Sequence, residues 1–159
     1  MEVTDWPDEP AERVRELVEC VLDQLDLDGD VEIEETDEAI TATVEGDEEY
    51  GLLIGRRGQT IDALQLLCFQ AAFQGMRERK RVILDAAGYR ARREEVIVER
   101  TDRAAEKAIA SGDEVELDPM PARERRVAHE HLKDRTEVET YSSGDDPQRR
   151  VVVAPLITE

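Results

Sequence analysis

Two adjacent arginines, Arg56 and Arg57, are framed by Gly55 and Gly58 immediately before a helix-like stretch. Glycine reaches positive φ angles and lets another chain approach the backbone closely, because it has no Cβ. At a helix N-terminus, unpaired N–H groups and the helix dipole favour a phosphate. Guanidinium groups match the oxygens of a phosphate with paired hydrogen bonds. The Gly-Arg-Arg-Gly pattern therefore predicts a turn that holds a sugar-phosphate backbone.

The residues beside this turn are expected to complete the site. Gln59 and Thr60 open the following helix, and Ile54, Ile61 and Leu64 supply an apolar floor against which bases could lie. A structural alternative exists, because any corner between two helices can contain two glycines separated by two residues. Two features favour phosphate binding. Both central residues are cations, and the turn lies between a strand pair and a helix–strand unit.

Arg125 and His129 lie four residues apart in a second helix-like stretch, so they share one of its faces. An imidazole beside a guanidinium can hold a phosphate jointly. Nucleophilic catalysis would need a serine or cysteine partner, which this helix lacks, so no catalytic residue is predicted. His131 is interpreted as a packed or solvated residue. Arg149 and Arg150, which open the last predicted strand, either extend a basic surface or discourage pairing at a strand edge.

The charge of the chain is divided unevenly. Its 159 residues carry 40 acidic and 21 basic side chains, a formal net charge of −19. Residues 1–50 contain 20 of the acids and 2 of the bases, whereas residues 51–159 contain 20 acids and 19 bases. So negative a chain does not attract nucleic acid over its whole surface. Any nucleic-acid contact is therefore expected at a local basic site.

The remaining composition excludes several classes of protein. Cys20 and Cys68, the only cysteines, lie on apolar helical stripes and are predicted to be buried free thiols in a reducing cytoplasm. With two cysteines and two histidines there is no spacing for a zinc site, and neither metal nor cofactor is predicted. The N-terminus lacks a signal-peptide pattern, and no stretch reaches 18 apolar residues. The prediction is a cytoplasmic protein without a membrane partner.

Hydrophobic periodicity predicts an α+β chain of two domains. In the first part we expect an amphipathic helix over residues 10–27, strands over 31–35 and 39–46 in a hairpin or meander, and a strand over 81–88. The segment 48–55 is either a short helix or an apolar approach to the turn. The helix after Gly58 is expected to bury a stripe of apolar side chains: Ile61, Leu64, Leu67, Cys68 and Ala71.

In the second part the pattern predicts helices over residues 89–112 and 120–134, the latter with a proline in its first turn. Extended segments are expected over 114–119, 138–142 and 149–155. The domain limits are placed at 1–9 for an N-terminal tail, 10–86 for the first domain and 87–159 for the second. Arg90, Arg92 and Arg93 are either exposed partners of Glu94 and Glu95 or part of an RNA path.

The stretch IGRRGQTIDALQ, within the order helix–strand–strand–helix–strand, resembles the KH domain. KH domains grip about four single-stranded nucleotides with a GXXG loop. The first helix, together with the helix and strand ending at VILD, resembles the bacterial type II arrangement, helix-strand-strand-helix-helix-strand. The resemblance implies RNA contacts at seven consecutive residues: Ile54, Gly55, Arg56, Arg57, Gly58, Gln59 and Thr60.

The stretch from PARERRVAHEHLKD to QRRVVVAP is similar to the R-3-H domain, named for an arginine and a histidine separated by three residues. That domain is associated with single-stranded nucleic acid and places the helix with the pair beside a small sheet. The resemblance implies a small α+β second domain. It also implies nucleic-acid contacts by Arg125 and His129, with Arg149 and Arg150 extending the surface.

The two domains in this order, over about residues 12–156, resemble the bacterial Jag family, also called KhpB or SpoIIIJ-associated proteins. Members often carry a separate N-terminal Jag domain, and no counterpart of that domain is expected in this sequence. The resemblance implies a non-enzymatic protein that binds single-stranded RNA, with single-stranded DNA as an alternative ligand. It further implies post-transcriptional regulation linked to cell elongation, division or sporulation, and a homodimer or a heterodimer with a second small KH protein.

Two alternatives remain open from the sequence. In the first, the chain is a protein–protein adaptor whose KH-like domain mainly mediates dimerisation, and the basic turn is incidental. In the second, it is an enzyme acting on nucleotides. The absence of metal ligands, of a P-loop and of a nucleophile–base pair disfavours the enzyme.

Overall fold

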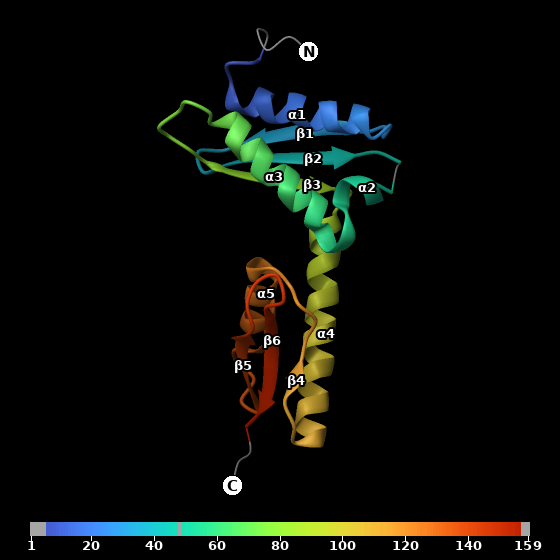
Figure 1. The fold of residues 1–159 in the computed structure, drawn as a ribbon, viewed down its shortest axis with the longest axis vertical. Coiled ribbons are helices and arrows are strands. Elements are labelled where there is room, and N and C mark those ends of the chain that lie inside the picture. Colours follow the sequence, from blue (N-terminus) through green and yellow to red (C-terminus); the bar gives the residue numbers. More distant parts are fainter. Residues whose placement is uncertain (1–5, 48, 157–159) are drawn as a thin grey trace. The chain divides into compact units, whose positions relative to one another are not determined.

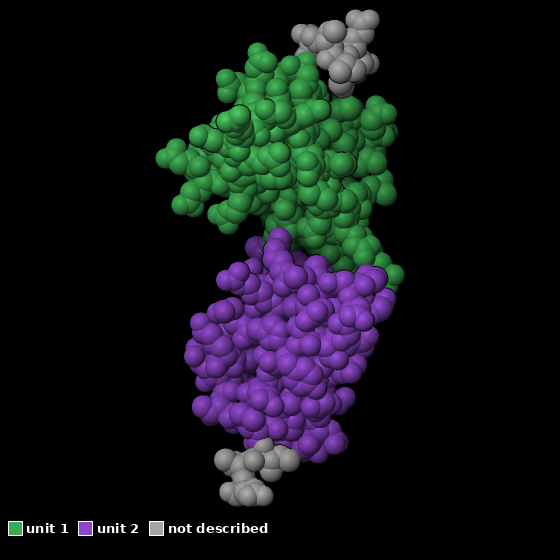
Figure 2. Space-filling model, turned by 60° about the vertical axis from the view of Figure 1, so that its left-hand side comes forward, with its two compact units in different colours: residues 1–90 green, residues 91–159 purple. Residues whose placement is uncertain are grey.

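The computed structural model describes residues 6–47 and 49–156. The chain divides into two compact units, residues 1–90 and residues 91–159, which Figure 2 shows in different colours. Residues 1–5 of the predicted N-terminal tail lie outside the described residues. The domain limits expected from the sequence stay predictions. In the described part of the chain, no helix is long and apolar enough to cross a membrane.

The first unit has the predicted order helix, strand, strand, helix, helix, strand. Its elements are α1 (Pro10–Gln24), β1 (Asp30–Glu35), β2 (Ala39–Glu45), α2 (Gly51–Ile54), the 3₁₀ turn η2 (Arg56–Gly58), α3 (Gln59–Ala72) and β3 (Arg81–Ala86). The central strand β2 pairs antiparallel with β1, as predicted, and parallel with β3 (Figure 1). Parallel strands need a crossover connection. Here α2, η2 and α3 make that crossover, so the Gly-Arg-Arg-Gly turn is a bend within it.

The core of the first unit lies between the sheet and the apolar faces of α1 and α3. Val14, Val18 and Leu22 of α1 are buried, as their helical spacing predicts. Ile61, Leu64 and Cys68 of α3 are also buried. Three further residues fill the space beneath them from the sheet: Ile40, Val44 and Leu84.

Two residues of the predicted α3 stripe, Leu67 and Ala71, do not belong to the core: Ala71 is half-buried, and Ala72 is buried in its place. Leu67 has an exposed fraction of 58%. The buried positions 61, 64, 68 and 72 follow a spacing of three, four and four residues. Leu67 lies to one side of this narrow stripe, next to Leu66, which is 59% exposed. The outer face of α3 therefore carries two exposed leucines.

The second unit places two helices on one face of a small antiparallel sheet. Its elements are α4 (Tyr89–Ser111), β4 (Val115–Glu116), α5 (Ala122–Leu132), β5 (Val138–Ser143) and β6 (Arg150–Pro155). Helix α4 belongs to this unit from Ala91 onward. The strand order is β4-β6-β5, so β6 is central. Its core joins Ile97 and Ala105 of α4, Ala128 and Leu132 of α5, and Val153 of β6. The predicted α+β class is confirmed for both units.

The two cysteines are free, and only one is fully buried. Cys68 lies in the core, and burial raises the pKa of its thiol to about 12. Cys20 is half-buried, so the prediction of complete burial is wrong for this residue. A thiol with so high a pKa has almost no thiolate at neutral pH, which makes Cys68 a packing residue.

Candidate nucleic-acid interface

The glycines of the Gly-Arg-Arg-Gly turn both take positive φ angles, as the sequence predicts. The angle is 72° at Gly55 and 79° at Gly58. A Cβ at Gly55 would lie 2.7 Å from the Cβ of Thr60, and a Cβ at Gly58 would lie 2.8 Å from Cε1 of Tyr89. These separations are too short for real carbon atoms. Both positions therefore need glycine for conformation and for space.

The two arginines of the turn have different environments. Arg56 is exposed, and its side chain makes no hydrogen bond or ion pair with the residues that the structure describes. Arg57 is half-buried and has φ 54° and ψ 29°, a left-handed conformation that is uncommon for a residue with a Cβ. The turn thus presents the Arg56 guanidinium to solvent from a tightly constrained backbone.

Helix α3 begins directly at the turn, where the N–H groups of Gly58 and Gln59 donate to the backbone O atoms of Gly55 and Arg56. Gly58 is its N-cap residue, and no side chain caps the first N–H groups. Gln59 and Thr60, the first two residues of the helix, are exposed. An anion at this end would meet backbone donors, the positive end of the helix dipole and the Arg56 guanidinium together. These are the groups that bind phosphate.

The apolar floor expected beside the turn is only partly present. Ile61 and Leu64 have exposed fractions of 0% and 5% and belong to the core. They point to the inner face of α3, so the expectation that bases lie against them is wrong. Ile54 is half-buried and remains the one residue of the expected floor with an exposed surface.

Arg125 lies in α5 with its side chain turned into its own unit. Its exposed fraction is 8%. Its Nη1 donates to the backbone O of Met120 at 2.8 Å and to Oδ1 of Asp146 at 3.1 Å. Met120 precedes α5, and Asp146 lies in the loop between β5 and β6, so the guanidinium joins three segments. A direct phosphate contact by Arg125 stays a prediction, and its burial favours a positioning role.

His129 shares this face of α5, as the four-residue spacing predicts. Its Nδ1 lies 2.7 Å from Oγ1 of Thr140, and its Nε2 lies 3.1 Å from Oγ of Ser142, both on β5. Burial, and then the positive charge of Arg125, lower the pKa of His129 from its usual 6.5. The ring is therefore mainly neutral at neutral pH, with one nitrogen donating and the other accepting. His129 anchors β5 to α5.

Arg149 and Arg150 lie at the start of the central strand of their sheet. The alternative that they protect a strand edge is wrong, because β6 has a neighbour on each side. Nη1 of Arg150 lies 2.9 Å from Oε2 of Glu116. Arg149 is half-buried, and its backbone O accepts a hydrogen bond from the N–H of Met120. Their part in a basic surface stays a prediction.

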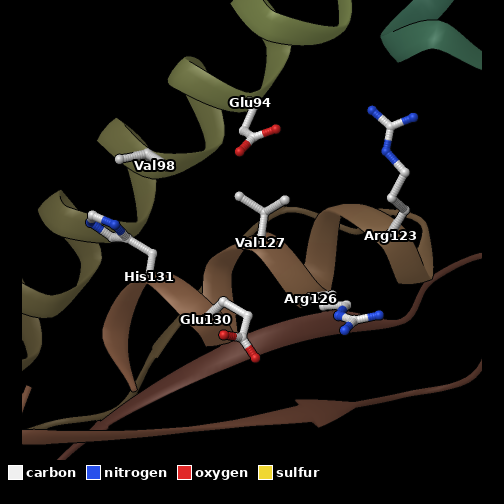
Figure 3. A pocket seen from close by; sticks show the side chains of 7 residues that line it. All are labelled: Glu94, Val98, Arg123, Arg126, Val127, Glu130 and His131. Carbon is white, nitrogen blue, oxygen red and sulfur yellow. The ribbon is translucent and has the colours of Figure 1, made fainter. Parts of the chain in front are cut away.

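A groove of about 510 Å³ lies between α4 and α5 (Figure 3). It is lined by Glu94 and Val98 of α4 and by Arg123, Arg126, Val127, Glu130 and His131 of α5. Arg123 is exposed and forms no hydrogen bond or ion pair within the described parts of the chain. The sequence gives no signal for this groove, because it arises only when two helices that are separate in the sequence pack together.

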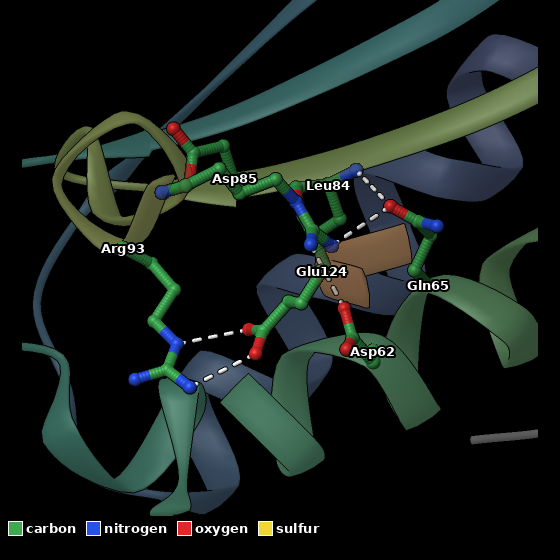
Figure 4. Close-up of polar contacts among 7 residues, drawn as sticks. Asp62, Gln65, Leu84, Asp85, Arg93 and Glu124 are labelled. Carbon is green, nitrogen blue, oxygen red and sulfur yellow. Dashed lines mark hydrogen bonds and ion pairs between the residues drawn. The ribbon is translucent and has the colours of Figure 1, made fainter. Parts of the chain in front are cut away.

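Arg90 holds the start of α3 in place. Its Nη1 donates to Oδ1 of Asp62 at 2.8 Å, its Nη2 to Oε1 of Gln65 at 2.9 Å, and its Nε to the backbone O of Leu84 at 2.6 Å. The N–H of Arg90 donates to Oδ1 of Asp85 at 3.0 Å. Figure 4 shows these four partners of Arg90. The cluster fixes the first turn of α3, directly after the Gly-Arg-Arg-Gly turn.

Arg93 makes the corresponding contact in the second unit. Its Nε and Nη2 each donate to one carboxylate oxygen of Glu124 at 2.9 Å (Figure 4). Glu124, in the first turn of α5, is 7% exposed, so the pair is shielded from solvent. The local partners that the sequence suggests, Glu94 and Glu95, are wrong for this arginine.

Among the described residues, no group of three or more His, Cys, Asp or Glu side chains could hold a metal ion.

Comparison with known families matches both units. Residues 11–85 match the family model "KhpA/KhpB, KH domain", and residues 95–155 match the model of the R-3-H domain. These segments contain the Gly-Arg-Arg-Gly turn and the Arg125–His129 pair respectively.

The chain is similar to several curated proteins named "RNA-binding protein KhpB". It is 35% identical to that of Clostridium symbiosum over 141 residues, which cover 87% of this chain and 63% of the relative. It is 36% identical to that of Lactiplantibacillus plantarum over 85% of this chain and 42% of the relative. It is 28% identical to that of Bacillus subtilis over 92% of this chain and 71% of the relative. The matches thus span from about two fifths to seven tenths of these relatives. The chain belongs to the Jag, or KhpB, family, in which a KH domain of the KhpA/KhpB type is followed by an R-3-H domain.

Proposed function

We propose that this chain binds single-stranded RNA and that the Gly-Arg-Arg-Gly turn holds the strand by its phosphates. One observation carries the proposal. The two left-handed glycines place the exposed Arg56 beside the N-terminus of α3, which has no side-chain cap. The match to a KH domain and the names of the relatives support RNA as the ligand. Single-stranded DNA presents the same phosphates and is the alternative strand.

The second unit takes a second stretch of the strand. Arg125 and His129 hold α5, β5 and the loop between β5 and β6 in their arrangement. Arg149 and Arg150 extend the basic surface at the start of β6. In this role the arginine–histidine pair acts mainly by positioning other groups.

The chain acts by binding, without catalysis. By its resemblance to the Jag family we place it in the bacterial cytoplasm as a post-transcriptional regulator, linked to cell elongation, division or sporulation. The strongly acidic residues 1–50 weaken binding elsewhere on the first unit, so the strand is directed to the basic turn.

Pairing with a second KH domain is the second part of the proposal. Leu66 and Leu67 are exposed on the outer face of α3, beside the uncharged Ala63 and Gln70. Two neighbouring leucines exposed on an uncharged helix face favour a protein interface at this face. The partner is a second copy or a second small KH protein, and the name of the matched family model supports such a partner. If pairing is the main activity, the chain is an adaptor. Sedimentation of Leu66→Glu/Leu67→Glu should then show a monomer where the wild type shows a dimer.

Titration of fluorescent RNA tests the RNA proposal. The wild type should bind a single strand more tightly than a matching duplex. The variant Arg56→Asp/Arg57→Asp should lose single-strand binding while keeping its melting temperature. Equal RNA affinity of variant and wild type would remove the turn from the interface, and absence of binding by both would favour the adaptor.

A further inference from the structure

The exposed cations of α5 lie away from its arginine–histidine pair. Arg125 is 8% exposed and engaged with Met120 and Asp146, and both ring nitrogens of His129 face hydroxyl groups of β5. Arg123 and Arg126, one helical turn apart, are exposed and line the groove between α4 and α5. A strand that docks on this helix therefore meets the groove arginines first.

The groove is preformed, because an ion pair and a hydrogen bond join α4 to α5, from α4 positions that precede and follow Glu94 and Val98. Arg93 of α4 binds Glu124 at the start of α5 with two bonds of 2.9 Å. Further along, Asp102 of α4 lies 2.9 Å from Nε2 of His131. A groove held in this way is not filled by local collapse of its walls, so a ligand finds it already open.

The charges within the groove are separated. Of its two carboxylates, Glu130 is bound to Lys133 at 3.0 Å. Glu94 lies on α4 and points toward Val127 (Figure 3). Arg123 and Arg126 supply guanidinium groups from the opposite helix. In Figure 3, Val127 lies between Glu94 and Arg126, whereas Arg123 extends beside them from the start of α5. From Arg126 to Glu94 the order is therefore cation, apolar surface, carboxylate.

This order matches one nucleotide of a single strand. Guanidinium groups bind the phosphate, an apolar side chain accepts the face of an unstacked base, and a carboxylate accepts a hydrogen bond from an exocyclic amino group such as N4 of cytosine. We propose that the groove between α4 and α5 binds one nucleotide of the RNA strand, with its phosphate at Arg123 and Arg126 and its base over Val127 toward Glu94. The proposal rests on the RNA binding proposed above and adds a site on the second unit.

Fluorescence anisotropy with short RNA oligonucleotides tests this site on the full chain. Arg123→Gln/Arg126→Gln should weaken binding by about tenfold, the loss expected when a charged hydrogen-bonding contact is removed. The matched control, Arg103→Gln/Lys107→Gln, removes the same charge from exposed positions of α4 outside the groove. It should change the affinity by less than about twofold. An equal loss in both variants would show a general charge effect and would overturn the site.

Base preference gives a second, independent readout. The wild type should bind oligocytidine more tightly than oligouridine, because only cytosine offers an amino group to Glu94. Glu94→Gln should narrow that difference, and an unchanged difference would contradict the assigned base position. The variant Arg56→Asp/Arg57→Asp separates the two proposals. If it abolishes binding while the groove variant behaves as its control does, only the groove proposal fails. If the wild type binds no RNA, both proposals fail.

Discussion

Arg90 and Asp62, 28 residues apart in the sequence, form an ion pair of 2.8 Å that joins the first turn of α4 to the first turn of α3. Asp62 is the acidic residue in that first turn of α3, close to where a phosphate would bind. A free carboxylate there would repel the phosphate. Arg90 neutralises it and fixes the helix end at the same time.

Replacing Arg90 should therefore affect both stability and RNA binding. Arg90→Gln should lower the free energy of unfolding by about 1–3 kcal/mol, because the partly buried partners of the guanidinium lose their donors. It should also weaken RNA binding several-fold by leaving Asp62 uncompensated. Urea titrations and RNA titrations measure the two effects.

The double variant Arg90→Gln/Asp62→Asn isolates the charge effect. It should regain RNA affinity without regaining full stability, because the repulsive charge is gone while the hydrogen bonds remain absent. Lys80→Gln breaks another ion pair of the same unit, with Glu35, and serves as the control that leaves RNA affinity unchanged. A double variant that binds RNA no better than Arg90→Gln would argue against this role for Arg90.

Gly58→Ala should destabilise the protein more than the same change at Gly75. Both glycines have φ of 79°, so the backbone strain of about 1–2 kcal/mol is common to both. A Cβ at Gly58 would meet the ring of Tyr89, whereas nothing lies within 4 Å of a Cβ at Gly75. Denaturant titrations of the two variants measure the difference. Equal losses would show that Tyr89 moves away freely and does not constrain the turn.

Stability should fall in mildly acidic solution because of His129. Its pKa is lowered in the folded protein, so below about pH 6.5, the ordinary value for histidine, the unfolded chain binds a proton more readily than the folded one. The contribution of His129 to the free energy of unfolding is complete above that pH. It is lost as the pH falls toward the pKa that His129 has in the folded protein. His129→Gln should remove this part of the pH dependence when urea midpoints at pH 7.5 and pH 5.5 are compared. A variant with an unchanged pH dependence would assign the effect to other groups.

Salt should stabilise the fold while it weakens RNA binding. On the outer face of the first sheet, Asp30 is paired directly opposite Glu45, and Glu32 and Glu34 are exposed on the same strand. Like charges at such positions are destabilising. Raising the salt from about 0.1 M to about 1 M shortens the screening length from about 10 Å to about 3 Å. The melting temperature should rise while the RNA affinity falls. Glu45→Gln should stabilise the protein at low salt only, and a melting temperature that is independent of salt would contradict this expectation.

Much of the architecture follows from local patterns in the sequence. The four-residue spacing of Val14, Val18 and Leu22 identifies α1 and its buried face, and alternation identifies β1 and β2. Gly55 and Gly58 reveal the turn because few other residues tolerate its backbone angles. These features depend on neighbours in the chain, so the sequence alone is enough to predict them.

The partners of the arginines could not be predicted in this way. The four-residue spacing of Arg125 and His129 shows that they share a face, but not that β5 and the loop at Asp146 cover it. Likewise, Arg90 finds Asp62 only because β3 brings the start of α4 back to α3. Contacts of this kind depend on tertiary packing, which periodicity does not contain.

Amide chemical shifts on RNA addition test the central claim most directly. In ¹⁵N-labelled protein titrated with a short single-stranded RNA, the largest shifts in the first unit should fall on the N–H groups of Gly58, Gln59 and Thr60. They should disappear in Arg56→Asp/Arg57→Asp. Binding that leaves these amides unchanged would show that the N-terminus of α3 does not hold the phosphate, and the RNA contact would have to be assigned elsewhere.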